Sequence, residues 1–422
     1  MLIYNASQLI TLAGGPQRGK KLGDLGIIPE GAVLIRDGLV QAVGLSQDLL
    51  EQYPREERFN AACKVVMPGF VDPHTHLIFI GNRAFEFEMR LEGRSYQEIM
   101  AAGGGIVNTV RITRDAGLDE LVSAARPRAM GMLRYGTTTA EAKTGYGLTP
   151  SSELSQLQAI LKLDQEGPLE LVPTYLAAHA IPLEYKHNPQ AYTDLVVNQM
   201  LPGVQAWWKR NHSSRPLPFV DVFCEVGAFS LEQSRQILSK AKELGFPLKI
   251  HADEFENLGG TSLAARMGAT SADHLVKTSE ADIQALGISN TVAVSLTPTP
   301  FGLGHSEYTP AQEILQANGL LAIASDLNPG TAWCESMQFV IALSCRYLKI
   351  TVAQAIAAAT INAAAAIGRA ERIGSLEPGK QADLLVLSVD DYRNLGYKFG
   401  GNLVQRVMKH GKWVVENATP SQ

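Results

Sequence analysis

Eight short apolar runs, separated by segments with helical periodicity, constrain the fold of this 422-residue chain more than any other feature of its sequence. Runs that alternate with helical segments in this way predict a parallel sheet covered by helices. Eight strands are enough to close such a sheet into a barrel. The runs span residues 71–76, 137–142, 171–178, 220–225, 248–251, 270–274, 291–296 and 320–326. We therefore predict an α/β fold with a (β/α)8 TIM-like barrel.

The segments between and after the runs contain sequence signals for helix N-termini. Ser230 followed by Gln233 forms a capping box, and Thr351 with Gln354 forms another. Residues 352–368 are mostly alanine, and this stretch falls short of the roughly 20 apolar residues that a membrane span needs. We expect a buried helix there.

Both ends of the chain carry strand signals instead. Segments rich in Val, Leu and Ile flank the turn residues Asp37 and Gly38, a pattern typical of a hairpin. The last 50 residues have similar runs, separated by glycine-containing turns. The sequence therefore predicts a small composite β-sandwich domain, built from residues 1–67 and 373–422, beside a barrel domain of residues 68–372.

The composition excludes several classes of protein. Apolar residues make up 45% and charged residues only 19%, against a globular norm of about 25%, which excludes a disordered or fibrous chain. The net charge of −5 would repel phosphate backbones and anionic lipids, so neither nucleic acid nor a membrane is an expected partner. The four cysteines lack a Cys-x-x-Cys pair and no basic residue precedes Arg18, which predicts a cytoplasmic protein.

Catalytic residues of a (β/α)8 barrel come from the C-terminal ends of its strands, and here those ends carry metal-binding side chains. His74 and His76 end the first run two residues apart, so their imidazoles project from the same face. His251, His274 and Asp326 end three further runs. Imidazole and carboxylate ligands suit zinc or iron. We therefore expect His74, His76, His251 and Asp326 to bind one divalent metal ion.

The motifs around these strand ends resemble the amidohydrolase superfamily over almost the whole chain. They are MPGFVDPHTHL at 67–77, GGGI at 103–106, KTGYGL at 143–148, AHAIP at 178–182, KIHADE at 249–254, SADHL at 271–275 and SDLNPG at 325–330. The first is common to the superfamily, and the later ones narrow the resemblance to a branch that opens a ring in histidine degradation. The resemblance implies the same metal ligands that the strand ends predict.

The resemblance also implies a reaction, the hydrolysis of the ring amide of 4-imidazolone-5-propanoate to N-formimidoyl-L-glutamate on a divalent zinc or iron ion. It implies that Glu254 and His274 lie near the attacking water and that Asp326 accepts a proton, although which of the first two is acid or base stays open. The implied substrate contacts are Arg83, Tyr96, Tyr146, His179, Glu254, Asn328, Gly330 and Thr331. Among them, Arg83 offers a planar fork for a carboxylate.

Several of these residues have a structural alternative. Arg83 stands close to Glu86 and Glu88 in sequence, so a surface ion pair is the alternative to substrate binding. Glu254 would otherwise cap the helix that follows it, and Tyr146 would otherwise pack within a glycine-rich turn.

Two further features bear on the metal and the substrate. A carbamylated Lys143 would bridge two metal ions, as in some relatives on this scaffold. Lys143 stands in a turn-like segment, however, which favours a site with one metal ion. Residues 295–305 read SLTPTPFGLGH, where the family usually shows Leu-Pro-Gly. This departure puts the fit of the substrate in doubt, and we expect it to leave the metal chemistry untouched.

Two other functions stay open. A deaminase on the same scaffold would use the same kind of metal site to release ammonia from a purine, a pyrimidine or a related ring. A non-catalytic barrel would use the histidines only to hold a structural metal, without an open position for water. If the resemblance holds, the partner is a small anionic imidazolone, and we expect a homodimer because barrels of this type commonly pair through exposed apolar faces.

Overall fold

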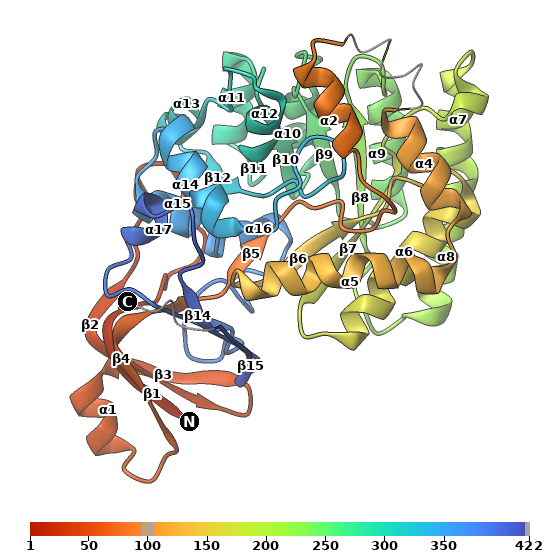
Figure 1. Ribbon diagram of the computed structural model, residues 1–422. Coiled ribbons are helices and arrows are strands. Elements are labelled where there is room, and N and C mark those ends of the chain that lie inside the picture. Colours follow the sequence, from red (N-terminus) through yellow and green to blue (C-terminus); the bar gives the residue numbers. More distant parts are fainter. Residues whose placement is uncertain (95–97, 99–103, 418–422) are drawn as a thin grey trace.

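The structure is a computed structural model that describes residues 1–94, 98 and 104–417, and its larger sheet contains eight parallel strands (Figure 1). They are β5 (Phe70–Asp72), β6 (Thr137–Lys143), β7 (Glu170–Ala178), β8 (Phe219–Cys224), β9 (Lys249–Ala252), β10 (Ser271–His274), β11 (Val292–Ser295) and β12 (Leu320–Ile323). Their order in the sheet follows their order in the sequence. Each of the eight predicted runs is therefore a strand.

The barrel closes through backbone that extends beyond the named ends of β5 and β12. The N–H of Asp326 donates to the carbonyl of His74 at 3.1 Å, and the N–H of His76 donates to the carbonyl of Leu327 at 2.9 Å. These two hydrogen bonds form a parallel β-bridge between Thr75 and Leu327. The segments that carry His74, His76 and Asp326 are thus hydrogen-bonded to each other.

The first and last strands end earlier than the sequence predicts. We expected the first to reach His76 and the last to reach Asp326, whereas β5 ends at Asp72 and β12 ends at Ile323. Pro73 follows β5 directly, and proline has no N–H to donate to a ladder. His74, His76 and Asp326 therefore lie on segments just past these two strands, whereas His251 lies within β9.

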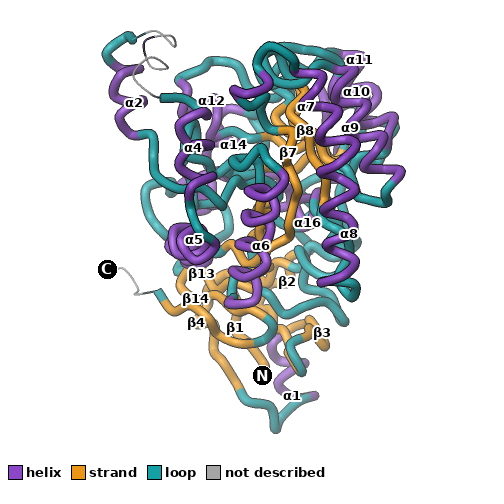
Figure 2. The backbone as a smooth tube through the Cα atoms, turned by 90° about the vertical axis from the view of Figure 1, so that its right-hand side faces the viewer, coloured by secondary structure: helices purple, strands orange, loops and turns teal. Residues whose placement is uncertain are grey.

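Helices cover the outside of the barrel (Figure 2). The capping boxes of Ser230 with Gln233 and of Thr351 with Gln354 are both present. The alanine-rich stretch is buried as predicted, but it forms two helices that are interrupted at Thr360. Among the described residues, no helix is both long and apolar enough to cross a membrane.

The helices of the barrel are α2 (Ala84–Leu91), α4 (Ile106–Asp115), α5 (Leu118–Arg134), α6 (Pro150–Glu166), α7 (Pro189–Leu195), α8 (Leu201–Asn211), α9 (Leu231–Glu243), α10 (Gly260–Met267), α11 (Glu280–Gly287), α12 (Pro298–Leu303), α13 (Ala311–Gln316), α14 (Met337–Tyr347), α15 (Val352–Ala358) and α16 (Ile361–Ala366). Short helical turns are η1 (Gly19–Lys21), η2 (Leu183–Tyr185) and η3 (Val196–Met200).

The two ends of the chain form a second sheet together, in the order β15-β14-β13-β4-β1-β2-β3. Its strands are β1 (Leu2–Ile10), β2 (Ile27–Arg36), β3 (Leu39–Leu45), β4 (Arg58–Pro68), β13 (Leu384–Leu387), β14 (Val404–Lys409) and β15 (Lys412–Glu416). Helix α1 (Ser46–Gln52) packs beside β1–β3, whereas α17 (Asn394–Tyr397) packs against α14 of the barrel. Asp37 and Gly38, with φ of 52° and 77°, make the predicted hairpin turn between β2 and β3. The predicted fold class is confirmed, and the domain boundaries stay a prediction.

The small sheet packs closely against the N-terminal end of the barrel, at the lower left of Figure 1. A Cβ atom on Gly136, which precedes β6, would lie 2.9 Å from side-chain atoms of both Leu385 and Val404. Beside this contact the Nζ atom of Lys409 lies 2.7 Å from Asp383 and 2.9 Å from Glu170. Apolar packing and a buried ion-pair cluster therefore hold the sheet against the barrel.

We predict that Leu385→Ala lowers the free energy of unfolding by about 2 to 5 kcal/mol, because it leaves a cavity between the small sheet and the barrel. Leu385 is 0% exposed, whereas Leu183 is 60% exposed and provides the matched control. Urea-induced unfolding followed by circular dichroism measures both variants. Equal effects of Leu385→Ala and Leu183→Ala would contradict the packing described here.

Candidate active site

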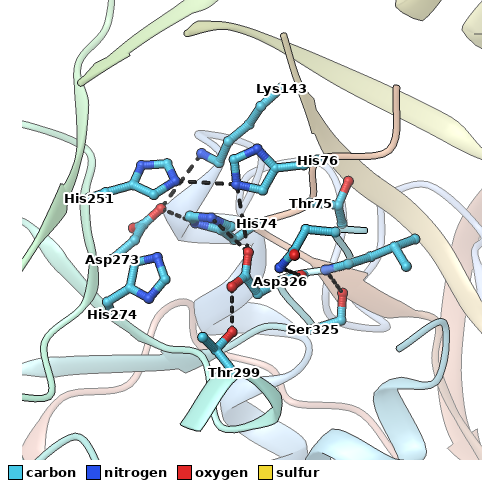
Figure 3. Close-up of polar contacts among 12 residues, drawn as sticks. His74, Thr75, His76, Lys143, His251, Asp273, His274, Thr299, Ser325 and Asp326 are labelled. Carbon is cyan, nitrogen blue, oxygen red and sulfur yellow. Dashed lines mark hydrogen bonds and ion pairs between the residues drawn. The ribbon is translucent and has the colours of Figure 1, made fainter. Parts of the chain in front are cut away.

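The four predicted metal ligands meet at the C-terminal mouth of the barrel (Figure 3). The Nε2 atoms of His76 and His251 lie 3.3 Å apart. The Oδ1 atom of Asp326 lies 3.5 Å from Nε2 of His74 and 3.6 Å from Nε2 of His76. All four residues are buried, with exposed fractions of 3% or less.

The spacing of these atoms fits a divalent metal ion. Ligand atoms at ~2.0–2.2 Å from a tetrahedral zinc ion lie roughly 3.3 to 3.6 Å from one another. Nε2 of His74 is buried and has no hydrogen-bond partner among the described residues, which suits a nitrogen that a metal completes. A second cluster of metal-binding groups joins His74 to His251 and His274, with ligand atoms within 4.8 Å of one another.

Asp326 is held by a residue that we did not predict. The hydroxyl of Thr299 donates a hydrogen bond to Oδ2 of Asp326. Burial is the largest influence on this carboxyl, and it raises the pKa of Asp326 to about 6. Thr299 lies within residues 295–305, at the start of α12, so this segment contacts a predicted metal ligand. Our expectation that the segment leaves the metal chemistry untouched stays a prediction.

Two of the histidines contact buried carboxylates that we also missed. Oδ2 of Asp273 lies 2.6 Å from Nδ1 of His74, and Oδ2 of Asp221 lies 3.0 Å from Nδ1 of His251. Both aspartate side chains are completely buried. The sequence signal for these two residues was an aspartate within an apolar strand segment. Such a segment does not reveal which histidine the aspartate contacts in the folded protein.

Lys143 lies at the end of β6 rather than in the turn-like segment that we expected. Its Nζ atom lies 2.7 Å from Asp221 and 2.8 Å from Glu141. Burial by itself lowers the pKa of Lys143, but the surrounding carboxylates outweigh it and hold the pKa above its ordinary value. Because only a neutral amine takes up carbon dioxide, this ion pairing disfavours a carbamate at Lys143.

A cavity lies beside the predicted metal ligands, at the mouth of the barrel. Every predicted substrate contact that the structure describes lines it, as do His274 and three of the predicted metal ligands. Tyr96, the remaining predicted contact, lies outside the described residues. The structure therefore brings the two predicted sets, metal ligands and substrate contacts, to the same cavity.

His179 and Tyr146 form one wall of this cavity. The ring of His179 stacks on that of His76, with centroids 4.7 Å apart and planes 15° apart, and its Nδ1 lies 3.0 Å from the carbonyl of Gly145. Burial lowers the pKa of His179 to about 3, so the imidazole is neutral at physiological pH. The centroid of Tyr146 lies 5.3 Å from that of His179. Both side chains can hydrogen-bond to a polar ring without adding charge.

Glu254 and His274 also line this cavity. Oε2 of Glu254 is 3.6 Å from Nδ1 of His274. Burial, together with the nearby carboxylates of Asp326 and Glu225, raises the pKa of Glu254 well above its ordinary value. Burial also lowers the pKa of His274 well below its ordinary value. The pair therefore combines a carboxyl that favours its protonated form with a neutral imidazole.

Arg83 pairs with Glu86 and also lines the cavity. Its Nε and Nη2 atoms donate to the Glu86 carboxylate at 2.8 and 2.7 Å, and Glu86 also accepts from the N–H of Gly105 at 2.9 Å. Glu86 is only 3% exposed, so this is not a surface ion pair. Two of the five guanidinium N–H groups bind Glu86, which leaves the Nη1 edge for a second carboxylate.

Asn328 shapes the remaining wall through its side-chain amide. Its Oδ1 accepts from the N–H of Gly330 at 2.7 Å and from the N–H of Thr331 at 2.8 Å. Its Nδ2 donates to the backbone carbonyl of Asp326 at 2.7 Å. Asn328 therefore connects the predicted substrate contacts to a predicted metal ligand.

Solved structures with a similar fold include two deaminases. Guanine deaminase from E. coli has a TM-score of 0.72 at 16% identity and covers 99% of each chain. An adenosine deaminase from Xanthomonas campestris with bound zinc has a TM-score of 0.69 at 18% identity, covering 98% of this chain and 92% of that chain. Identities this low show the fold alone.

Comparison of sequences identifies the family more specifically than the similarity of fold does. Residues 65–414 match the model of the amidohydrolase family. An imidazolonepropionase from Herpetosiphon aurantiacus is 51% identical over 99% of this chain and 97% of its own length. Another from Chloroflexus aggregans is 48% identical over 99% of both chains. Together with the histidine and aspartate cluster at the barrel mouth, these matches show that the chain belongs to the amidohydrolase family and, within it, to the imidazolonepropionases.

Proposed function

We propose that this chain hydrolyses the ring amide of 4-imidazolone-5-propanoate to N-formimidoyl-L-glutamate in histidine degradation. The observation that supports it most directly is the convergence of His74, His76, His251 and Asp326 beside a cavity lined by the predicted substrate contacts. The imidazolonepropionase relatives, at up to 51% identity, support the choice of substrate.

We assign one divalent ion, zinc or iron, to His74, His76, His251 and Asp326. When bound, such an ion lowers the pKa of a water ligand from 15.7 towards about 7 and so supplies a nucleophile at neutral pH. The ion-paired state of Lys143 supports a single ion, because this lysine does not offer a bridging carbamate.

Each proton transfer of the reaction is assigned to a different residue around the ion. Asp326 accepts a proton from the attacking water, and the Thr299 hydroxyl orients its carboxylate. The neutral imidazole of His274 donates a hydrogen bond to the oxyanion that forms on the attacked carbonyl. Glu254, whose raised pKa favours the protonated carboxyl, gives its proton to the departing ring nitrogen.

The remaining cavity residues recognise the substrate in this proposal. Arg83 binds the propionate through its free Nη1 edge, while Tyr146 and His179 hydrogen-bond to the heterocycle. Asn328, Gly330 and Thr331 form the wall beside the metal, and Tyr96 completes the predicted set of contacts.

The activity assay incubates the purified protein with 4-imidazolone-5-propanoate and follows the loss of the ring chromophore. We expect turnover that chelator treatment abolishes and that added zinc or iron restores. Release of ammonia would instead indicate a deaminase, and a protein that holds metal without turning over imidazolones or amides would be a binding barrel.

We predict that His74→Ala and Asp326→Ala each abolish turnover and stoichiometric metal binding, because each removes a ligand. Metal analysis of the purified variants and the ring-opening assay give the two readouts. His187 is exposed and distant from the cluster in sequence, so His187→Ala is the control that keeps both properties. Full activity with one metal per chain in either ligand variant would contradict the assignment.

We predict that Arg83→Ala lowers kcat/KM about 10- to 150-fold, because a hydrogen bond to a charged group contributes about 1.5 to 3 kcal/mol. Steady-state kinetics on the propanoate substrate measures the loss. Arg111 is exposed on α4, and Arg111→Ala should leave kcat/KM unchanged. An unchanged value in Arg83→Ala would remove Arg83 from the substrate site.

We also propose that the enzyme is a cytoplasmic homodimer. Its four cysteines are free thiols, which suits a reducing compartment. Phe85, Phe87 and Leu91 are 44%, 49% and 69% exposed along α2, and exposed apolar patches often mark interfaces between proteins. Light scattering should give twice the chain mass of 45.6 kDa, and a monomer at micromolar concentration would contradict the dimer.

A further inference from the structure

Five charged side chains lie buried together beside the metal-binding histidines, and we call them the charged layer. They are Glu141, Lys143, Asp221, Lys249 and Asp273, and all five side chains are 0% exposed. Figure 3 shows two of them, Lys143 and Asp273, next to His74 and His251. The reaction proposed above gives none of these five residues a chemical step.

The charged layer contacts the metal ligands at two points, and both contacts are at Nδ1. Asp273 lies 2.6 Å from Nδ1 of His74, and Asp221 lies 3.0 Å from Nδ1 of His251. A neutral imidazole carries its proton on one nitrogen only, and a carboxylate at Nδ1 favours the proton there. The lone pair is then on Nε2, which is the atom that each ring presents to the other ligands.

Both carboxylates are themselves held in place. Asp273 accepts from the hydroxyl of Ser271 at 2.6 Å, and Asp221 accepts from the N–H of Val222 at 2.7 Å. Lys143 connects the two, since its Nζ lies 2.7 Å from Asp221 and 3.7 Å from Asp273. The two histidine contacts are therefore parts of one ion-paired network.

Lys249 attaches this network to the backbone that precedes the first ligand. Its Nζ lies 3.6 Å from Asp273 and 3.0 Å from Glu141, and it donates to the carbonyl of Pro73 at 2.7 Å. Pro73 directly precedes His74, so the charged layer holds both the side chain of His74 and the backbone beside it.

His76 and His274 lack such a short contact. Among the described residues, no carboxylate forms an ion pair with Nδ1 of His76, and Nδ1 of His274 faces Glu254 only at the longer distance of 3.6 Å. Among these four imidazoles, carboxylate contacts of 3.0 Å or less at Nδ1 are thus confined to His74 and His251.

We propose that Asp273 and Asp221 are positioning residues for the metal site, which fix His74 and His251 in the tautomer and orientation that bind the ion, and that Lys143 couples them. The inference rests on the metal ligands of the proposed function. It does not depend on the identity of the substrate, because it concerns the affinity of the site for a metal.

The test is a zinc titration of chelator-treated protein in competition with a chromophoric chelator. Carboxylate partners of metal-binding histidines typically contribute 10- to 100-fold to metal affinity. We expect Asp273→Asn and Asp221→Asn each to weaken zinc binding by that factor, because the amide keeps the shape of the side chain but loses its charge. Zinc affinity within about threefold of the unaltered protein in both variants would overturn the proposal.

Asp383→Asn is the matched control, because Asp383 is also a buried carboxylate paired with a lysine, Lys409, at 2.7 Å. It lies in the small sheet region and contacts no metal ligand. We expect a lower melting temperature with unchanged zinc affinity, whereas an equal loss of affinity would show that the Asp273 effect is general destabilisation.

Ser271→Ala gives a milder perturbation if Asp273→Asn fails to fold, since it removes only the hydrogen bond to Asp273. Zinc binding weakened a few-fold supports the positioning role, and unchanged binding overturns it. An unaltered protein that binds zinc tightly but does not open the imidazolone ring would refute the proposed function and leave this result standing.

Discussion

The backbone pairing of residues 74–76 with residues 326–327 is the interaction on which the rest of the structure depends. It closes the barrel between its first and last strands, and the same short segments present His74, His76 and Asp326. Because these ligands lie on backbone that is itself hydrogen-bonded, their positions do not depend on a free loop. The same hydrogen bonds that close the sheet into a barrel therefore also bring three of the four predicted metal ligands together.

The strands, and the convergence of the four predicted metal ligands at the barrel mouth, were predictable because their signals are local. Apolar runs mark the strands, and a polar residue at the end of such a run is placed by the barrel geometry alone. The partners of the ligands were not predictable, because the contact of Asp273 with His74 depends on how distant strands align. Thr299 was missed for the same reason, since it reaches Asp326 only after α12 folds against the end of β12.

Two clusters of buried charges among the described residues consist of carboxylates paired with lysines. The charged layer lies against the metal ligands, whereas Lys409 with Asp383 and Glu170 joins the small sheet to the barrel. An unpaired charge in such surroundings costs several kcal/mol, so each cluster requires that its elements approach in one arrangement only. Paired charges thus contact imidazole rings at one end of the barrel and a neighbouring sheet at the other.

The small sheet has a consequence for synthesis of the chain on the ribosome. β4 pairs with β1 on one side and with β13 on the other, and β13 follows the whole barrel in sequence. A nascent chain therefore exposes the outer edge of β4 throughout translation of the barrel, and an open strand edge invites pairing with other chains. Residues 384–387 cover this edge near the end of translation, so chaperones that shield unpaired strands have their main task before that point.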